Sequence, residues 1–233
     1  MGTVACAVAV TGPLAERAGG SFAAHMGVHL LLGMAGPLLL VRAAPVTLAL
    51  RVLPTVKARR LARALASLPV RFLSHPVTSA GGNVAALVVL YTTSLYHLSG
   101  RSESLHLLVH AHFFVFGYLF AAGIVGVDPN PHRLSVRFRS AVLVLFGAAH
   151  GILAKHLYAV PPPGVDSAQA QLGAQVLYYG GDVIDLAMMV LLWHRWYVLG
   201  ASHCRTEPSA HSEQRHRIEA SSRARARYRR TSP

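Results

Sequence analysis

The chain has 233 residues, 53% of them apolar and only 13% charged, a balance that excludes an ordinary soluble globular domain. Its net charge of +13 could indicate nucleic-acid binding, but the Arg residues fall in blocks between apolar runs and near the carboxyl end, with few aromatic residues among them. Such blocks are typical of charges that orient a membrane protein and contact lipid headgroups, so we expect no nucleic-acid partner.

The first apolar stretch, residues 2–12, has only about half of the ~20 residues that a spanning helix needs. No basic residue precedes it, which makes a secretory signal peptide a poor fit. We interpret residues 1–20 as an outer amino-terminal segment, the remnant of a transmembrane helix whose beginning lies upstream.

Five later apolar stretches are each long enough to cross the hydrocarbon core of a bilayer. Turns rich in Pro, Gly and Ser separate most of them. We expect the spans at about residues 21–41, 77–98, 103–127, 140–160 and 174–196. The sequence therefore predicts an all-α fold, a polytopic bundle of transmembrane helices over residues 21–198.

Two basic segments accompany the bundle. After an apolar patch that Pro45 and Pro54 break into a turn, residues 51–71 carry six Lys and Arg residues with leucines at helical spacing, which predicts an amphipathic helix on an anionic leaflet. From about residue 199 the composition shifts to Ser, Arg, Glu and His and ends in an Arg-rich run, so we expect residues 199–233 to form a disordered basic tail.

The distribution of positive charge predicts the orientation of the bundle. Nineteen of the 22 Lys and Arg residues fall on one side of the expected spans, whereas Arg17 and Arg101 fall on the other. By the positive-inside rule the rich side is cytoplasmic. We expect a multi-pass membrane protein with a cytoplasmic carboxyl terminus, whose basic loops and tail contact anionic lipid.

Removal of residues 199–233 is expected to leave the thermal stability of the detergent-solubilised protein unchanged. The segment has no apolar face to bury, and its like charges repel each other. Thermal unfolding of the full and shortened chains checks this expectation. A large loss of stability in the shortened chain would show that the tail packs on the bundle.

The most informative motif is His25-Met26-Gly27-Val28-His29 at the start of the first full span. On a helix, His25 and His29 lie on one face, and Met26 lies about 100° round from His25, so imidazole and thioether groups project from adjoining surfaces. The third expected span carries a second i, i+4 pair, His106 and His110. Ligating groups inside an apolar helix are costly, so they indicate function.

The depth of these residues in the membrane suggests that they share a site. At 1.5 Å per residue, His29, His110 and Asp182 each lie roughly 10 Å below the outer boundary. Imidazole and thioether donors suit copper, with the thioether favouring Cu(I), whereas imidazole with carboxylate would suit Cu(II) or zinc. The predicted ligands of a copper ion, most consistent with Cu(I), are His25, Met26, His29, His106, His110 and Asp182.

Less specific roles are open for several of these groups. Buried histidines often form hydrogen bonds between helices, and this applies to His97, His112, His150 and His156. Asp182 and Asp185 could instead form a proton relay or an ion pair with Lys155. Met26 could be an ordinary packing residue.

Several short motifs together resemble the CtaG-type cytochrome c oxidase assembly factors, which are polytopic bacterial membrane proteins. These motifs are residues 22–32 with the His-Met pair, 35–39, Ala44-Pro45, Leu105-His106 with His110, 117–120 and 126–129, within a similarity that covers about residues 12–197. The resemblance implies a non-enzymatic role in the bacterial cell membrane. It implies that the protein presents copper from the outer face to the copper centres of a haem-copper oxidase, whose subunits would be its partners.

Two other functions stay open from the residues alone. Ser94-Leu95-Tyr96-His97 looks like the Ser-x-x-His of the hemolysin III group, which would make the protein an intramembrane zinc-dependent hydrolase. Two histidines on different helices could also hold the iron of a b-type haem, and the purified protein would then be red.

Overall fold

The computed structural model describes residues 20–126 and 134–198, and within these ranges every regular element is a helix. This confirms the predicted all-α fold. The expected tail, nearly all of the amino-terminal segment and the Asp128-Pro129 loop lie outside the described residues. The chain divides into a compact unit, Met1–Leu192, and a second unit, Trp193–Pro233. In the described part of the second unit, the rings of Trp193 and Trp196 meet edge to face, with centroids 5.5 Å apart.

Four described helices are long and apolar enough to cross a membrane, and a shorter apolar helix accompanies them. The four are Phe22–Arg42, α10 (Glu103–Ile124), α11 (Val136–Ala159) and a last helix, Ser167–Val198; the shorter one is α8 (Pro76–Thr92). These five correspond to the five expected spans, although α8 has only 17 residues. The protein is therefore a multi-pass membrane protein.

The second expected span, residues 77–98, is interrupted near its end. The hydroxyls of Thr92 and Thr93 each donate to the carbonyl of the residue four positions earlier, at 2.6 Å, and Thr93 has an extended backbone. Such bonds to the preceding turn compete with helix propagation. The chain then forms the short helix α9 (Leu95–Ser99) before α10 begins.

The first span is one continuous helix with a wider turn in its middle. It consists of α3 (Phe22–Leu30), a π-helical turn η1 (Leu31–Ala35) and α4 (Gly36–Arg42). Ser21 begins it: the Ser21 hydroxyl accepts from the Ala24 N–H and donates to the amide oxygen of Gln169 on the last helix. A π-turn inside an α-helix often marks a functional site, and this one directly follows His29.

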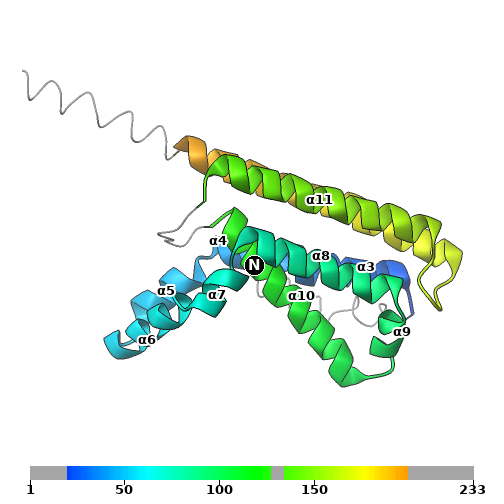
Figure 1. Cartoon of the computed structure of the whole chain (residues 1–233), viewed down its shortest axis with the longest axis horizontal. Coiled ribbons are helices and arrows are strands. Elements are labelled where there is room, and N and C mark those ends of the chain that lie inside the picture. The colour runs from blue at the N-terminus through cyan, green and yellow to red at the C-terminus, as the bar shows by residue number, and fades with distance from the viewer. Residues whose placement is uncertain (1–19, 127–133, 199–233) are drawn as a thin grey trace, which may run out of the picture. The chain divides into compact units, whose positions relative to one another are not determined.

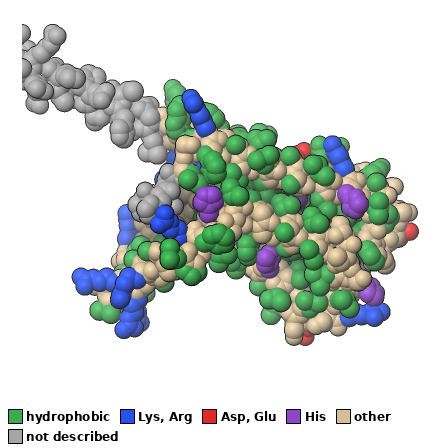
Figure 2. Space-filling view, in the orientation of Figure 1, with side chains coloured by type: hydrophobic (Ala, Val, Ile, Leu, Met, Phe, Trp, Pro, Cys, Tyr) green, Lys and Arg blue, Asp and Glu red, His purple; other side chains and the backbone are tan. Residues whose placement is uncertain are grey.

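The predicted amphipathic helix over residues 51–71 is instead divided into short helices. They are α5 (Pro45–Val52), α6 (Thr55–Leu65) and α7 (Leu68–Leu73). Pro54 and Pro69 explain the breaks, since proline lacks an N–H and fits only at the start of a helix. The blue Lys and Arg side chains gather over these helices at one end of the view in Figure 2. The charge pattern predicted from the sequence is present, on helices shorter than expected.

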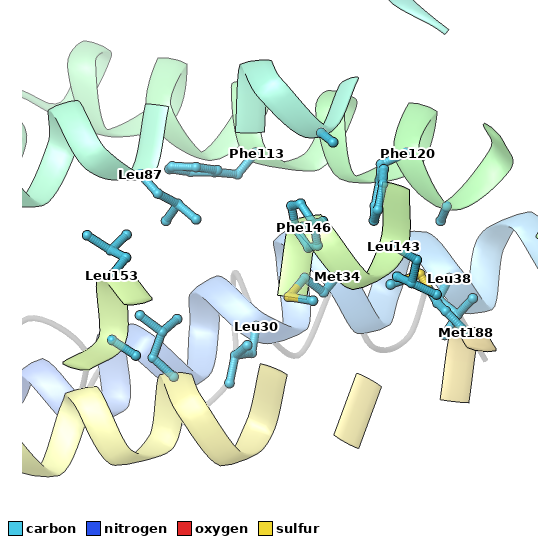
Figure 3. Packing of buried hydrophobic residues seen from close by; sticks show 14 of the residues in the cluster. Leu30, Met34, Leu38, Leu87, Phe113, Phe120, Leu143, Phe146, Leu153 and Met188 are labelled. Carbon is cyan, nitrogen blue, oxygen red and sulfur yellow. The ribbon is translucent and has the colours of Figure 1, made fainter. Parts of the chain in front are cut away.

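The core forms where the first span packs against α10 and where α11 packs against α8. Figure 3 shows side chains from these elements meeting in one cluster, among them Leu30, Leu87, Phe113 and Phe146. At the crossing of the first span and α10, the Gly117 Cα approaches the backbone of Gly33 so closely that a Cβ at Gly117 would collide with the Gly33 carbonyl oxygen. This glycine therefore permits the contact between the two helices.

α11 and the last helix run side by side in opposite directions (Figure 1). Their contacts show the direction: Gly147 lies against Asp185, and Gly151 lies against Tyr178. The first span has 67% of its most apolar window buried, against 22–39% for α10, α11 and the last helix. The first span is thus central, and the other three present apolar side chains to the lipid. The histidine motif lies on the most enclosed helix of the bundle.

Candidate metal site

His25 and His29 project from α3 into a small cavity inside the bundle. They are 7% and 5% exposed, respectively, and both line a cavity of ≈ 10 Å³ whose other walls are mostly apolar. That volume is close to the minimum that holds one water molecule. Imidazoles so enclosed are costly to charge, so they suit a role as neutral ligands with a free lone pair.

His110 reaches the same cavity from α10. Its Nδ1 lies 2.9 Å from the His106 carbonyl oxygen, and because a carbonyl only accepts, Nδ1 must carry the hydrogen. The Nε2 of the neutral ring then keeps its lone pair. Histidines that bind metals are usually oriented in this way by a bond from the other ring nitrogen. The His110 ring centroid lies 6.2 Å from that of His25 and 4.2 Å from that of the exposed His106.

Aromatic rings surround the buried imidazoles. Tyr91 and Tyr96 meet the His25 ring edge to face at 6.2 and 5.0 Å between centroids, and Phe113 meets the His29 ring at 4.5 Å. Tyr91 is buried, lines the cavity, and its hydroxyl has no hydrogen-bond partner within the described ranges. A buried hydroxyl normally has a partner, so this one is expected to bond to a water or ligand.

The imidazoles meet in pairs rather than around one point. Within residues 20–126 and 134–198, no three His, Cys, Asp or Glu side chains are arranged to hold a metal ion together. From their equal depth in the membrane, His29 and His110 were expected to lie together. The structure instead places the His25 ring beside His110, and the His29 ring 6.5 Å from that of His150 of α11. Which residues of two helices meet depends on where and at what angle the helices cross. Counting residues along straight helices does not take this crossing into account. The shared four-histidine site stays a prediction.

Two predicted ligands lie away from the cavity. Met26 is fully buried, but its side chain packs towards Gly173 of the last helix and does not line the cavity. The 100° rotation between neighbouring helix positions explains this placement, since His25 already faces the cavity. Asp182 is exposed on the last helix, where its neighbour Gly181 takes the inward position against His150.

The other four candidate histidines differ in their surroundings. His112 stacks on Phe116, and its Nε2 lies 3.4 Å from the Gly82 carbonyl oxygen of α8, as expected for a bond between helices. His97 and His156 are exposed. His150 is buried at 3% exposure. The sequence signal that could have singled it out is its depth, which is comparable to that of His29.

Lys155 and Asp185 both lie in the contact between α11 and the last helix. The Lys155 ammonium lies over the Tyr178 ring, 5.5 Å from its centroid. Both carboxylate oxygens of Asp185 are buried beside Gly147 with no hydrogen-bond partner in the described part of the chain. Asp185 therefore belongs to the contact between α11 and the last helix rather than to the cavity.

The geometry weighs against the two rival functions. A cavity of ≈ 10 Å³ does not admit a haem macrocycle between the histidines. Ser94 and His97, the pair that resembled a zinc hydrolase motif, are both exposed at the break between α8 and α9 and do not line the cavity. A water-filled zinc site on these two residues has no support in the structure.

Comparison with known proteins adds an independent finding. The sequence pattern of the cytochrome c oxidase caa3 assembly factor family (Caa3_CtaG) matches residues 1–198, which confirms the resemblance seen in the motifs. Uncharacterized proteins Mb0105 of Mycobacterium bovis and MT0111 of Mycobacterium tuberculosis are each 40% identical over 150 residues, 60% of this chain and 23% of theirs. Uncharacterized protein ML1998 of Mycobacterium leprae is 31% identical over 196 residues, 75% of this chain and 30% of its own. The chain thus spans less than a third of these relatives, and no solved structure matches it.

Proposed function

The chain belongs to the family of cytochrome c oxidase caa3 assembly factors, and from this premise we propose that it binds copper and presents it to the copper centres of a haem-copper oxidase. The observation that carries the proposal is the meeting of His25 and His110 at the cavity between the first span and α10. His106 lies beside His110 on α10, and His29 lies one turn from His25 on α3, so both are further candidate ligands.

The spacing of these two rings leaves room for a metal ion between them. Metal–nitrogen bonds to imidazole are about 2.0–2.1 Å, and a ring nitrogen lies about 1.2 Å from the ring centroid, so two imidazoles on opposite sides of one ion have centroids about 6.4 Å apart. The observed separation is 6.2 Å. Neutral imidazoles in apolar surroundings favour an ion of low charge, because burying a monovalent cation costs less than burying a divalent one. Cu(I) fits this description.

The arrangement also offers a path between the surface and the cavity. His106 is exposed and its ring lies 4.2 Å from that of His110, which in turn faces the buried His25. Copper would bind first at His106 and His110 and then pass inward to His25, or leave by the same route. By the positive-inside rule this end of α10 is on the outer face of the membrane, where the oxidase subunits would receive the metal.

The partners that follow are oxidase subunits and anionic lipid. The lipid contact is the role we propose for the basic helices α5 to α7, whose Lys and Arg residues lie among exposed apolar side chains such as Val52 and Phe72. The protein would act by binding and transfer of a metal ion, with no catalysed reaction.

Copper binding by the purified protein tests the proposal. The full chain in detergent is titrated with Cu(I) against a chromophoric competitor, beside a variant with His25→Ala and His29→Ala. Wild type is expected to retain copper against the competitor, and the double variant to lose most of it. His112→Ala is the matched control, because it removes a histidine of α10 that bonds to Gly82 and does not line the cavity. A double variant that binds copper like wild type would contradict the proposal.

A further inference from the structure

His150 of α11 is a buried imidazole that the copper route above does not use. It is 3% exposed, and its Nε2 has no hydrogen-bond partner among the described residues. The ring stacks on Phe146 with centroids 5.9 Å apart, and Nδ1 lies close to the backbone of Gly181. A buried ring nitrogen without a partner costs free energy. A ligand bound to this nitrogen would offset that cost.

The group that faces His150 across the bundle is His29. Their ring centroids are 6.5 Å apart. This separation leaves room for one metal ion between the rings, since two imidazoles on opposite sides of an ion have centroids about 6.4 Å apart. It is also close to the 6.2 Å between His25 and His110. The two pairs thus repeat the same spacing, one helical turn apart along α3.

We propose that His29 and His150 form a second, inner metal position, distinct from the outer position between His25 and His110. The proposal rests on the proposed function, because it takes Cu(I) as the ion. α3 carries one ligand of each position, while α10 supplies the other ligand of the outer position and α11 that of the inner. The inner position accounts for the unpartnered Nε2 of His150, which a purely structural histidine leaves unexplained.

The surroundings of the inner position indicate which ion it takes. Phe113 packs on the His29 ring and Phe146 on the His150 ring, so the position has apolar walls. Two neutral imidazoles leave the full charge of the ion uncompensated, which favours a monovalent ion over a divalent one. Cu(I) combines this low charge with a preference for imidazole and sulfur donors over oxygen.

Copper stoichiometry of the full chain in detergent tests the inner position. We expect wild type to bind two Cu(I) ions per chain, and His150→Leu and His25→Leu to bind one each. His156→Leu is the matched control, because it removes an exposed histidine from the same helix and is expected to keep both ions. Thermal unfolding without metal gives a second readout: His150→Leu should be at least as stable as wild type, since it removes an unpartnered polar atom, yet gain less stability from added Cu(I).

A second variant disturbs the position without removing a ligand. A Cβ at Gly181 would lie 2.6 Å from the His150 Nδ1, so Gly181→Ala must displace the ring. We expect this variant to bind Cu(I) more weakly at the inner position and with unchanged affinity at the outer position. If His150→Leu and Gly181→Ala both bind copper like wild type while His25→Leu loses it, the inner position is refuted and the proposed function stands. A wild-type chain that binds no Cu(I) refutes both.

Discussion

Replacement of His29 by Ala is expected to leave the haem-copper oxidase of the cell present but short of copper. His29 lines the cavity and its ring lies 6.5 Å from that of His150, so its loss removes a ligand of the proposed inner position. Alanine is a better helix former than histidine and buries no polar group, so α3 should still fold. The measurement is the copper content and activity of the purified oxidase, beside a deletion strain that sets the full effect.

Added copper salt is expected to restore part of the respiration in both strains, because mass action replaces a weak delivery step. His97→Ala serves as the control, since His97 is exposed and does not line the cavity. An intramembrane hydrolase would behave differently: oxidase copper would stay normal, and copper salt would rescue nothing. Normal oxidase copper in the deletion strain would therefore refute the delivery of copper and return the zinc hydrolase to consideration.

Gly117→Ala is expected to destabilise the bundle strongly. The new Cβ would collide with the Gly33 carbonyl oxygen, and backbone on both sides prevents either group from rotating away. Overpacking of a tight core usually costs about 1–3 kcal/mol, and a backbone clash falls at the upper end of that range. The first span and α10 would separate, which would also disturb the His25–His110 pair. Thermal unfolding in detergent measures the loss.

The matched control is Gly81→Ala in α8, where a Cβ would meet no packed neighbour within 4 Å. The same substitution there is expected to stabilise the helix by up to about 1 kcal/mol, because glycine is a poor helix former. Equal stability of Gly117→Ala and wild type would show that the two helices do not cross as closely as the structure places them.

The sequence by itself determined the membrane bundle and the helix that carries the motif. Apolar runs of about 20 residues form helices in a bilayer because the backbone must satisfy its own hydrogen bonds there. The first, third and fourth spans were therefore located within four residues, whereas the second ends six residues earlier and the fifth begins seven residues earlier than expected. The i, i+4 spacing put His25 and His29 on one face, as the structure confirms. The prediction of one amphipathic helix over residues 51–71 was wrong, because Pro54 and Pro69 cannot lie inside a helix and divide the segment.

Only the tertiary structure decided which histidines meet. Depth counting treats every span as a straight helix of equal tilt, whereas the crossing at Gly33 and Gly117 and the π-turn after His29 set the actual register. His25 therefore lies beside His110, and His29 lies beside His150. Met26 and Asp182 lie at the depth expected for ligands, but their side chains point away from the cavity. The packing of the helices decides which face of each helix points inward, and residue spacing within one helix does not reveal it.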